Sequence, residues 1–305
     1  MADFLREPTA RTLVAGELEA VFLPNQGMLG ASLRHRGVEL LGRVEDLDAA
    51  AARGSTAGIP FLHPWANRLA EPRYLVGGRQ VELDLSSPLL HLDEHKLPIH
   101  GVAWSRLRWE VTGARRDFVR ARLEWSAREL LAIFPFRHRV ELTAIIRPDG
   151  LTLETMLVAG SDGPVPLSFG FHPYFRVPGL PRAKWHLGLP EMRRLVLDVR
   201  GIPNGDEESF GGFSGQLGEN YFDDGFALLQ ERTSFSVVGA AYTVGVDFLE
   251  GYRYAQLFAP KHTDYIALEP MTAPTSALAS GHGLRLVDAD EQFRAVFRIL
   301  IDGPH

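Results

Sequence analysis

Apolar and polar residues alternate along three stretches of the chain, 119–125, 136–147 and 293–301. In the first, arginine and glutamate occupy the positions between valine, alanine, leucine and tryptophan. Successive side chains of a β-strand point to opposite faces of its sheet, so a period of two predicts strands that are buried on one face. The segment Pro148-Asp149-Gly150 lies between two such runs and has the composition of a tight turn. The pattern therefore predicts antiparallel strands.

Signals for helices are sparse. Only Val44–Arg53, with two aspartates, an alanine run and Gly54 behind it, predicts a short helix. Residues 201–220 are rich in glycine, serine, asparagine and acidic residues, and we expect a long surface loop there. Strands without interleaved helices favour a sandwich over a parallel α/β sheet. We therefore predict an all-β fold, a large antiparallel β-sandwich with few short helices, formed by residues 1–305 as one domain.

The charge and hydropathy of the chain exclude several partners. Its 305 residues include 32 Lys and Arg against 38 Asp and Glu, which gives a net charge of −6. Nucleic-acid binders usually carry a basic field, and no dense basic run occurs here, so we expect no nucleic-acid partner. No apolar stretch reaches the roughly 20 residues that a membrane span needs. The first residues include acids where a secretory signal would be basic and then apolar, so we expect a cytoplasmic protein.

The residue types that are missing or rare exclude several chemistries. The chain has no cysteine, which rules out thiol catalysis, disulfides and cysteine-ligated metals. None of the three lysines follows a glycine, so a P-loop cannot form. His91, Asp93, Glu94 and His95 lie close together but match no familiar metal-ligand spacing, and we interpret them as an exposed polar loop. We expect neither a metal nor an organic cofactor.

Two polar residues stand in otherwise apolar strands, each directly before a proline: His172 before Pro173, and Glu269 before Pro270. Proline lacks the N–H of the ladder and favours extended geometry in the residue before it, so each should lie where a strand leaves the sheet. Such positions suit catalytic groups on a rigid scaffold. The alternative readings are a hydrogen-bonded structural histidine and, because Glu269 shares the parity of Tyr265, a solvent-facing glutamate.

Three other segments carry candidate polar groups, the first of which could orient sugar hydroxyls. In Trp65-Ala66-Asn67-Arg68 the arginine offers a planar fork of donors and the tryptophan a stacking face. His100 follows Leu97-Pro98-Ile99, and Asp223-Asp224 stands among aromatic residues. Taken singly, the first segment could be a capped turn with a surface arginine, and the last an Asx turn.

Together, these segments resemble the aldose 1-epimerase (galactose mutarotase) family. The resemblance extends from Gly27 to the final strand, and four motifs occur in the family's order and approximate spacing: Trp65-Ala66-Asn67-Arg68, Ile99-His100-Gly101, Phe171-His172-Pro173-Tyr174-Phe175 and Leu268-Glu269-Pro270-Met271-Thr272. Val102 departs from the family's frequent second glycine. The resemblance implies a large antiparallel β-sandwich with the sugar in an open cleft, in agreement with the alternating pattern.

The resemblance also implies a role for each matched residue. Glu269 would be the general base that takes the proton of the anomeric hydroxyl, and His172 the general acid that protonates the ring oxygen so that the C1–O5 bond opens. Reclosure after rotation gives the other anomer. The residues expected to hold the sugar are Asn67, Arg68, His100, Asp223 and Tyr174, with His100 also assisting catalysis. Asp224 is the alternative to Asp223.

Mutarotation is proton transfer with ring opening, which fits the absence of any cofactor signal. The expected substrates are free aldohexoses such as glucose or galactose, and the expected state is a monomer or a homodimer. Three alternatives stay open. The first is a mutarotase for a phosphorylated or otherwise modified hexose, with Arg73 or other arginines around the anion. The others are a non-catalytic carbohydrate-binding protein and a glycoside hydrolase that uses Asp223 and Glu269 as its carboxylate pair.

Overall fold

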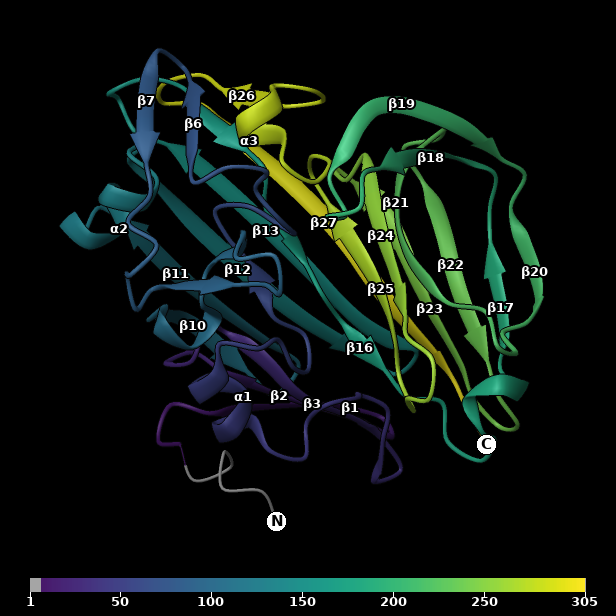
Figure 1. Cartoon of the computed structure of the whole chain (residues 1–305). Helices are drawn as coiled ribbons and strands as arrows, with labels where there is room; N and C mark the ends of the chain where they lie inside the picture. Colours follow the sequence, from purple (N-terminus) through teal and green to yellow (C-terminus); the bar gives the residue numbers. More distant parts are fainter. Residues whose placement is uncertain (1–6, 305) are drawn as a thin grey trace.

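The structure is a computed structural model that describes residues 7–304. It confirms the predicted all-β fold: two large antiparallel sheets, several smaller ones and three short α-helices. Figure 1 shows the long strands of the largest sheet crossing the molecule side by side. None of the helices in the described part of the chain has the length and hydrophobicity needed to cross a membrane.

The largest sheet has nine strands, and the strand that ends the chain lies at its middle. In spatial order the strands are β10 (Glu110–Arg115), β11 (Phe118–Trp125), β12 (His138–Arg147), β13 (Gly150–Ala159), β27 (Gln292–Asp302), β23 (Thr243–Glu250), β22 (Thr233–Val238), β17 (His186–Leu189) and β20 (Phe213–Gln216). The three alternating stretches fall on β11, β12 and β27, as predicted. The turn before Gly150 joins β12 to β13.

The second large sheet carries the site described below. Its strands are, in order, β19 (Pro203–Phe210), β18 (Met192–Leu197), β21 (Phe222–Leu228), β24 (Tyr254–Ala259), β25 (Ile266–Met271), β15 (Gly170–Phe171) and β5 (Phe61–Leu62), and β16 (Tyr174–Phe175) also pairs with β25. On β25, Ile266 and Leu268 point into the main core and Glu269 points to the other face.

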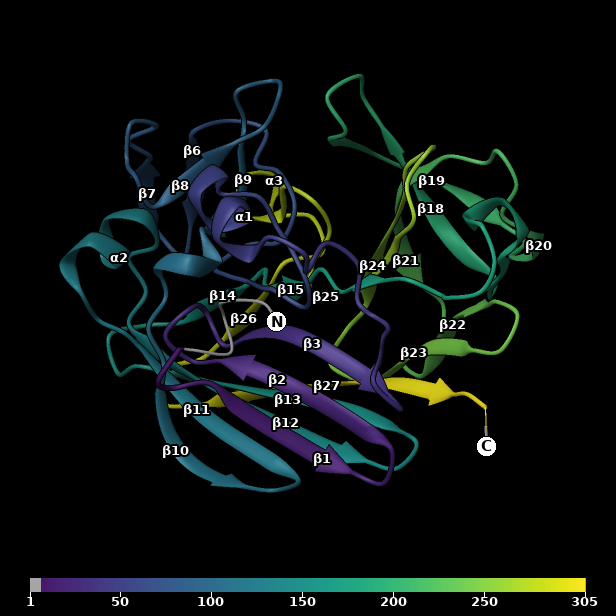
Figure 2. The same ribbon diagram turned by 90° about the horizontal axis from the view of Figure 1, so that it is seen from below.

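Smaller elements cover the two sheets. A four-stranded sheet, β1 (Arg11–Ala15), β2 (Leu18–Leu23), β3 (Leu29–His35) and β4 (Val38–Glu39), packs on the largest sheet; in the view from below, β1 and β2 lie along β12 (Figure 2). The remaining strands and α-helices are the hairpins β6 (Arg73–Val76) with β7 (Arg79–Glu82) and β8 (Leu90–Leu92) with β9 (Pro98–Val102), the pair β14 (Val165–Leu167) with β26 (Arg285–Val287), and the helices α1 (Leu47–Arg53), α2 (Arg128–Ile133) and α3 (Ala277–Ser280).

The predicted helix forms and ends before Gly54 as expected, but α1 begins at Leu47 and not at Val44. Asp46 accepts a hydrogen bond from the N–H of Ala49 (2.9 Å), and Gly54 ends α1 in the left-handed conformation. The prediction of a long loop over 201–220 is wrong, because β19 and β20 form there. Both are edge strands of their sheets and largely exposed. Solvated edge strands need no alternation of apolar residues, which explains why their composition is typical of a loop.

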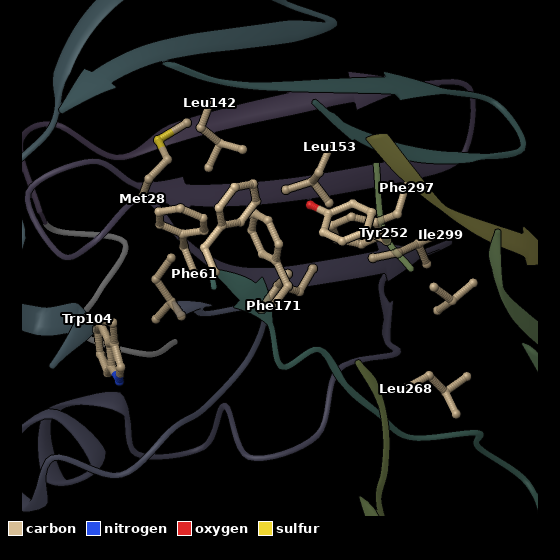
Figure 3. Packing of buried hydrophobic residues seen from close by; sticks show 14 of the residues in the cluster. Met28, Phe61, Trp104, Leu142, Leu153, Phe171, Tyr252, Leu268, Phe297 and Ile299 are labelled. Carbon is tan, nitrogen blue, oxygen red and sulfur yellow. The ribbon is translucent and has the colours of Figure 1, made fainter. Parts of the chain in front are cut away.

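The core between the two large sheets is aromatic and aliphatic. Phe171 of β15 packs against Phe297 of β27 with ring centroids 5.0 Å apart, and Tyr252 lies 5.8 Å from the same ring (Figure 3). Phe61 and Leu268 add further buried surface from the second sheet. This packing fixes the backbone of the strands from which the functional side chains project.

A buried histidine pair lies within this core. The Nε2 atoms of His63 and His138 are 2.8 Å apart, and both rings are enclosed by aromatic residues, with Trp125 against each. Nδ1 of His138 lies 2.6 Å from the carbonyl oxygen of Phe136 and must donate to it, because a carbonyl only accepts. Burial lowers the pKa of both rings, so both are neutral. A neutral His138 with its proton on Nδ1 accepts at Nε2, and His63 Nε2 is then the donor.

Candidate active site

His172 and Glu269 are cross-strand neighbours. Gly170 of β15 pairs with Met271, and Tyr174 of β16 pairs with Ala267, so His172 falls opposite Glu269 between the two pairs. His172 leaves its strand there, as predicted. For Glu269 that prediction is wrong, because β25 runs through Pro270 to Met271. A proline follows each of the two residues and lacks the N–H that the ladder needs, so pairing with β25 is interrupted between β15 and β16.

The row of polar groups continues across the sheet. Gln256 of β24 pairs with Glu269 on its other side, and the next strand places Gly225 opposite Gln256. A side chain at Gly225 would approach Gln256 Oε1 to 3.2 Å, so the glycine leaves room for the amide. Gln256 Nε2 donates to Asp223 Oδ1 at 2.7 Å. Sequence reasoning missed Gln256, although it is a lone polar residue in an apolar strand, the same signal that identified His172 and Glu269.

The two central groups touch each other and are almost inaccessible. His172 Nε2 lies 3.1 Å from Glu269 Oε1, and the residues are 5% and 1% exposed. The interpretation of Glu269 as a solvent-facing residue is therefore wrong. Its parity does point it away from the main core, but the segments described below cover that face. His172 Nδ1 is also buried, with no hydrogen-bond partner among residues 7–304.

Burial drives both groups toward their neutral forms. It raises the pKa of Glu269 well above the usual range for a glutamate, and the negative charge of Asp223 adds to this while Arg68 opposes it. Burial likewise lowers the pKa of His172 well below that of a free imidazole, aided by the neighbouring His100 and by Arg43. Over the pH range in which both members of a normal glutamate–histidine pair would be charged, burial therefore favours neutral side chains here, with a single proton shared between them.

The segment around Asn67 and strand β9, which carries His100, form the opposite wall of the site. The N–H of His100 donates to the carbonyl oxygen of Asn67 (2.9 Å), and the N–H of Asn67 donates to Nδ1 of His100 (3.2 Å). Asn67 and His100 both have positive φ, at 57° and 62°, and Arg43 at the rim has 59°. Non-glycine residues in this conformation cost about 1–3 kcal/mol each and persist where the surroundings enforce them. The surrounding structure therefore holds these side chains in place at the cost of local backbone strain.

His100 is a neutral hydrogen-bond donor in this arrangement. Because Nδ1 accepts from Asn67, the proton of the neutral ring belongs on Nε2. Burial, together with the charge of Arg68, lowers the pKa of His100 to about 3. Its ring stands nearly perpendicular to that of His172, with centroids 5.5 Å apart. It can therefore donate to a sugar oxygen without carrying charge.

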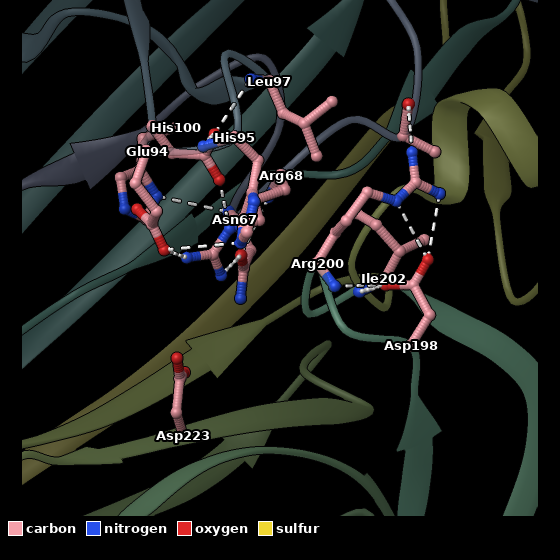
Figure 4. A network of polar contacts seen from close by, with 12 residues as sticks. Asn67, Arg68, Glu94, His95, Leu97, His100, Asp198, Arg200, Ile202 and Asp223 are labelled. Carbon is pink, nitrogen blue, oxygen red and sulfur yellow. Dashed lines mark hydrogen bonds and ion pairs between the residues drawn. The ribbon is translucent and has the colours of Figure 1, made fainter.

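Arg68 is fixed by carboxylates at the edge of the site. Its Nε donates to Asp93 Oδ2 at 2.6 Å, and a terminal nitrogen lies 3.4 Å from Glu94. Asp223 lies across from this group, on the sheet (Figure 4). Asp93 and Glu94 belong to the polar cluster that the sequence analysis interpreted as an exposed loop. For Asp93 that interpretation is wrong, since its side chain is buried against the arginine.

Tyr174 supports His172 from one side. The two rings stack with centroids 4.3 Å apart, and the phenol oxygen lies 3.3 Å from His172 Nε2 and 2.6 Å from Thr56 Oγ1. The Arg43 guanidinium sits over the ring of Tyr174, 5.1 Å from its centroid, and over that of Tyr265. Among residues 7–304 no carboxylate lies within ion-pair distance of Arg43.

All seven candidate residues of the sequence analysis line one pocket of about 160 Å³. They are Asn67, Arg68, His100, His172, Tyr174, Asp223 and Glu269; the other lining residues are Arg43, Thr56, Ile99, Gln256 and Phe258. Asp224 points elsewhere, toward Arg194 at 3.6 Å. Asp223 lies within β21, so its alternative reading as an Asx turn is wrong.

Two expectations about this region are corrected. Trp65 is fully buried in the core and offers no stacking face to a ligand. Arg73 lies outside the pocket and pairs with Glu71 at 2.8 Å. In the part of the chain that the structure describes, no group of three or more histidines and carboxylates is arranged to hold a metal ion.

Comparison with known proteins agrees with this description. The sequence profile of the family described as aldose 1-epimerase matches residues 12–300. A galactose mutarotase-like protein from Clostridium acetobutylicum has 20% identity and a TM-score of 0.82 over 96% of this chain and 95% of its own. A galactose 1-epimerase from Lactobacillus acidophilus NCFM (15%, TM-score 0.75, 97% and 95% covered) and a GalM/aldose epimerase homologue from C. elegans (15%, TM-score 0.78, 97% and 100% covered) share the fold. A search of curated proteins gives no match.

Proposed function

The chain belongs to the aldose 1-epimerase family, a family of carbohydrate isomerases, and on this premise we propose that it interconverts the α and β anomers of free aldohexoses such as glucose or galactose. The observation that carries the proposal is the contact of 3.1 Å between His172 and Glu269 inside a pocket lined by sugar-type donors and acceptors. An acid and a base side by side suit a substrate whose two reacting oxygens share one carbon.

In the proposed reaction the shared proton must reside on His172. Glu269, then ionised, removes the proton of the anomeric hydroxyl while His172 protonates the ring oxygen, and the C1–O5 bond opens to the aldehyde. After rotation about C1–C2, Glu269 returns its proton to the carbonyl oxygen as the ring oxygen, deprotonated by His172, attacks C1. The pair has the same number of protons before and after. Each positioned acid or base contributes about 10²–10⁴-fold to such a step.

The surrounding groups have complementary tasks in this proposal. His100 Nε2–H and the terminal nitrogens of Arg68 are donors suited to the ring oxygen and to hydroxyls, and they stabilise negative charge there. Asp223 and the side-chain oxygen of Asn67 are acceptors for sugar hydroxyls. Tyr174 presses on the imidazole of His172 and holds its orientation. Because protons only move between side chains and sugar, the reaction needs no oxidant, reductant or cofactor.

The test is polarimetry of freshly dissolved α-D-glucose and α-D-galactose. Wild-type protein should speed the approach to rotational equilibrium, and His172→Asn and Glu269→Gln should each lose at least about 100-fold in kcat. The matched controls are the exposed residues His282 and Glu231, changed in the same way. Saturable sugar binding without acceleration would instead indicate a binding protein, and release of a chromogenic aglycone a glycoside hydrolase. Either result would refute the proposal.

A second candidate, a mutarotase for an anionic hexose such as a hexose 6-phosphate, is favoured by Arg43. Its guanidinium lines the pocket and is stacked on Tyr174 and Tyr265 without a carboxylate partner among the described residues. A phosphate or carboxylate on the sugar would satisfy it. Competition by glucose 6-phosphate against glucose separates the two candidates. If the anionic sugar is preferred, Arg43→Met should abolish that preference; if Arg43→Met changes kcat/KM equally for both sugars, this candidate fails.

A further inference from the structure

The loop after β8 is built around one buried carboxylate. Asp93 Oδ1 accepts the N–H groups of His95 and Leu97, both at 2.9 Å, while Oδ2 accepts Nε of Arg68 at 2.6 Å. The side chain of Asp93 is 2% exposed and that of Arg68 13%. Hydrogen bonds between charged, buried groups are roughly twice as strong as neutral ones. One carboxylate oxygen of Asp93 therefore binds its own loop, and the other binds Arg68.

This contact decides which atoms of Arg68 are free. Nε is occupied by Asp93, so the two terminal nitrogens are the ones left for other partners, and their contacts with Asn67 and Glu94 are long, 3.4 Å each. The side chain of Glu94 is 70% exposed, so solvent weakens its ion pair with Arg68. Figure 4 shows Arg68 between Asn67 and Glu94, with Asp223 on the sheet opposite.

Asp93 also balances charge next to the acid–base pair. Arg68 opposes the rise in the pKa of Glu269 and contributes to the low pKa of His100, whereas Asp93 acts on His100 in the opposite direction. Burial alone would lower the pKa of Arg68, but its bond to Asp93 and the charges of Asp223, Asp93 and Glu94 raise it. The arginine therefore stays charged while its field on the pocket is partly cancelled.

We propose that Asp93 is a positioning residue that holds Arg68 by Nε, directs its terminal nitrogens at the sugar and offsets its charge. The inference rests on the proposed function. The same loop architecture occurs at Asp198, whose Oδ1 accepts from Arg200 (2.8 Å) and Ile202 (3.0 Å) and whose Oδ2 accepts from Arg200 Nε (3.0 Å). There the arginine belongs to the loop itself and does not line the pocket (Figure 4). Asp198 thus provides a matched control.

The test compares Asp93→Asn with Asp198→Asn, alone and with Arg68→Ala. We expect Asp93→Asn to lower kcat/KM about 10- to 100-fold, and Asp198→Asn to change it less than about twofold. In the Arg68→Ala background, Asp93→Asn should add almost nothing, because it acts through the arginine. The acid limb of the pH–rate profile should also move to lower pH in Asp93→Asn, because the uncompensated Arg68 favours ionised Glu269.

Equal losses from Asp93→Asn with and without Arg68, or an unmoved acid limb, would overturn the inference. A crystal structure of Asp93→Asn provides a readout independent of activity: Arg68 should lose its single orientation, and an arginine fixed as in the wild type would also overturn it. If the wild-type protein accelerates mutarotation of no sugar, the proposed function fails, whereas the orientation of Arg68 in that crystal structure still decides the role of Asp93.

Discussion

The buried pair His63–His138 predicts a loss of stability in mild acid. Both rings are neutral in the fold, because burial lowers the pKa of His63 well below normal, aided by His138, and lowers that of His138 to about 4. In the unfolded chain a histidine titrates near 6.5. Between these values the unfolded state binds more protons than the fold, so stability falls as pH drops below about 6.5, and the contribution of His138 levels off below about 4.

The size of the effect follows from the value for His138. For a group with a pKa of about 4 in the fold and about 6.5 unfolded, the free energy of unfolding decreases by about 2 kcal/mol between pH 7.5 and pH 5. The full loss, reached below about pH 4, is about 3 kcal/mol. His63 shifts in the same direction and adds to it. These contributions should vanish when both rings are replaced together by leucine, which leaves neither partner alone.

The assay is urea unfolding of wild type and of the double variant His63→Leu/His138→Leu at the two pH values. Wild type should lose at least about 2 kcal/mol more than the variant between pH 7.5 and pH 5. Other buried histidines, His172 and His100, contribute to both proteins and cancel in the comparison. An identical pH dependence in the two proteins would refute the assignment of the pair as neutral.

Three further predictions follow from the same structure. The kcat/KM profile from pH 5 to 9 should be bell-shaped, because the pair of Glu269 and His172 is active only with one proton. It binds a second proton in acid and loses its only proton in alkali, so a flat profile would contradict the assignment. Gly101→Ala should lower the Tm by at least about 4 °C, since φ is +65° and a methyl group would collide with the carbonyl oxygen of His63, and calorimetry measures this. Arg182→Met should cost about 3–5 kcal/mol in urea unfolding, because the buried guanidinium donates to three carbonyl groups; a cost below about 1 kcal/mol would contradict it.

Much of the fold could be predicted from local pattern alone. The alternation on β11, β12 and β27 is strong because each strand has one face in the core and the other in water. The edge strands β19 and β20 escaped prediction for the opposite reason, since neither has a face that must be apolar throughout. Burial of only one face is therefore the property that produces the alternation by which these three strands could be predicted.

The site was predictable as residues but not as geometry. His172 and Glu269 can be recognised in the sequence as polar residues before prolines in apolar strands. Their pairing, however, depends on the register between β25 and the two short strands β15 and β16 beside it. Nothing local encodes that register. In the sequence, Asp93 could be recognised only as part of a polar cluster. Its hydrogen bond with Arg68 joins two segments that lie 25 residues apart along the chain. Such contacts depend on the path of the whole chain.

The position of β27 constrains how the protein can be made. This last strand lies between β13 and β23, and its pairing with both joins the two halves of the nine-stranded sheet. During synthesis the strands before it have no partner at those two edges, which are long and rich in apolar residues. Unpaired edges of this kind favour aggregation. The sheet therefore cannot close gradually as the chain emerges, because its two halves join only once β27, which follows all the other strands of the sheet in the sequence, has been made.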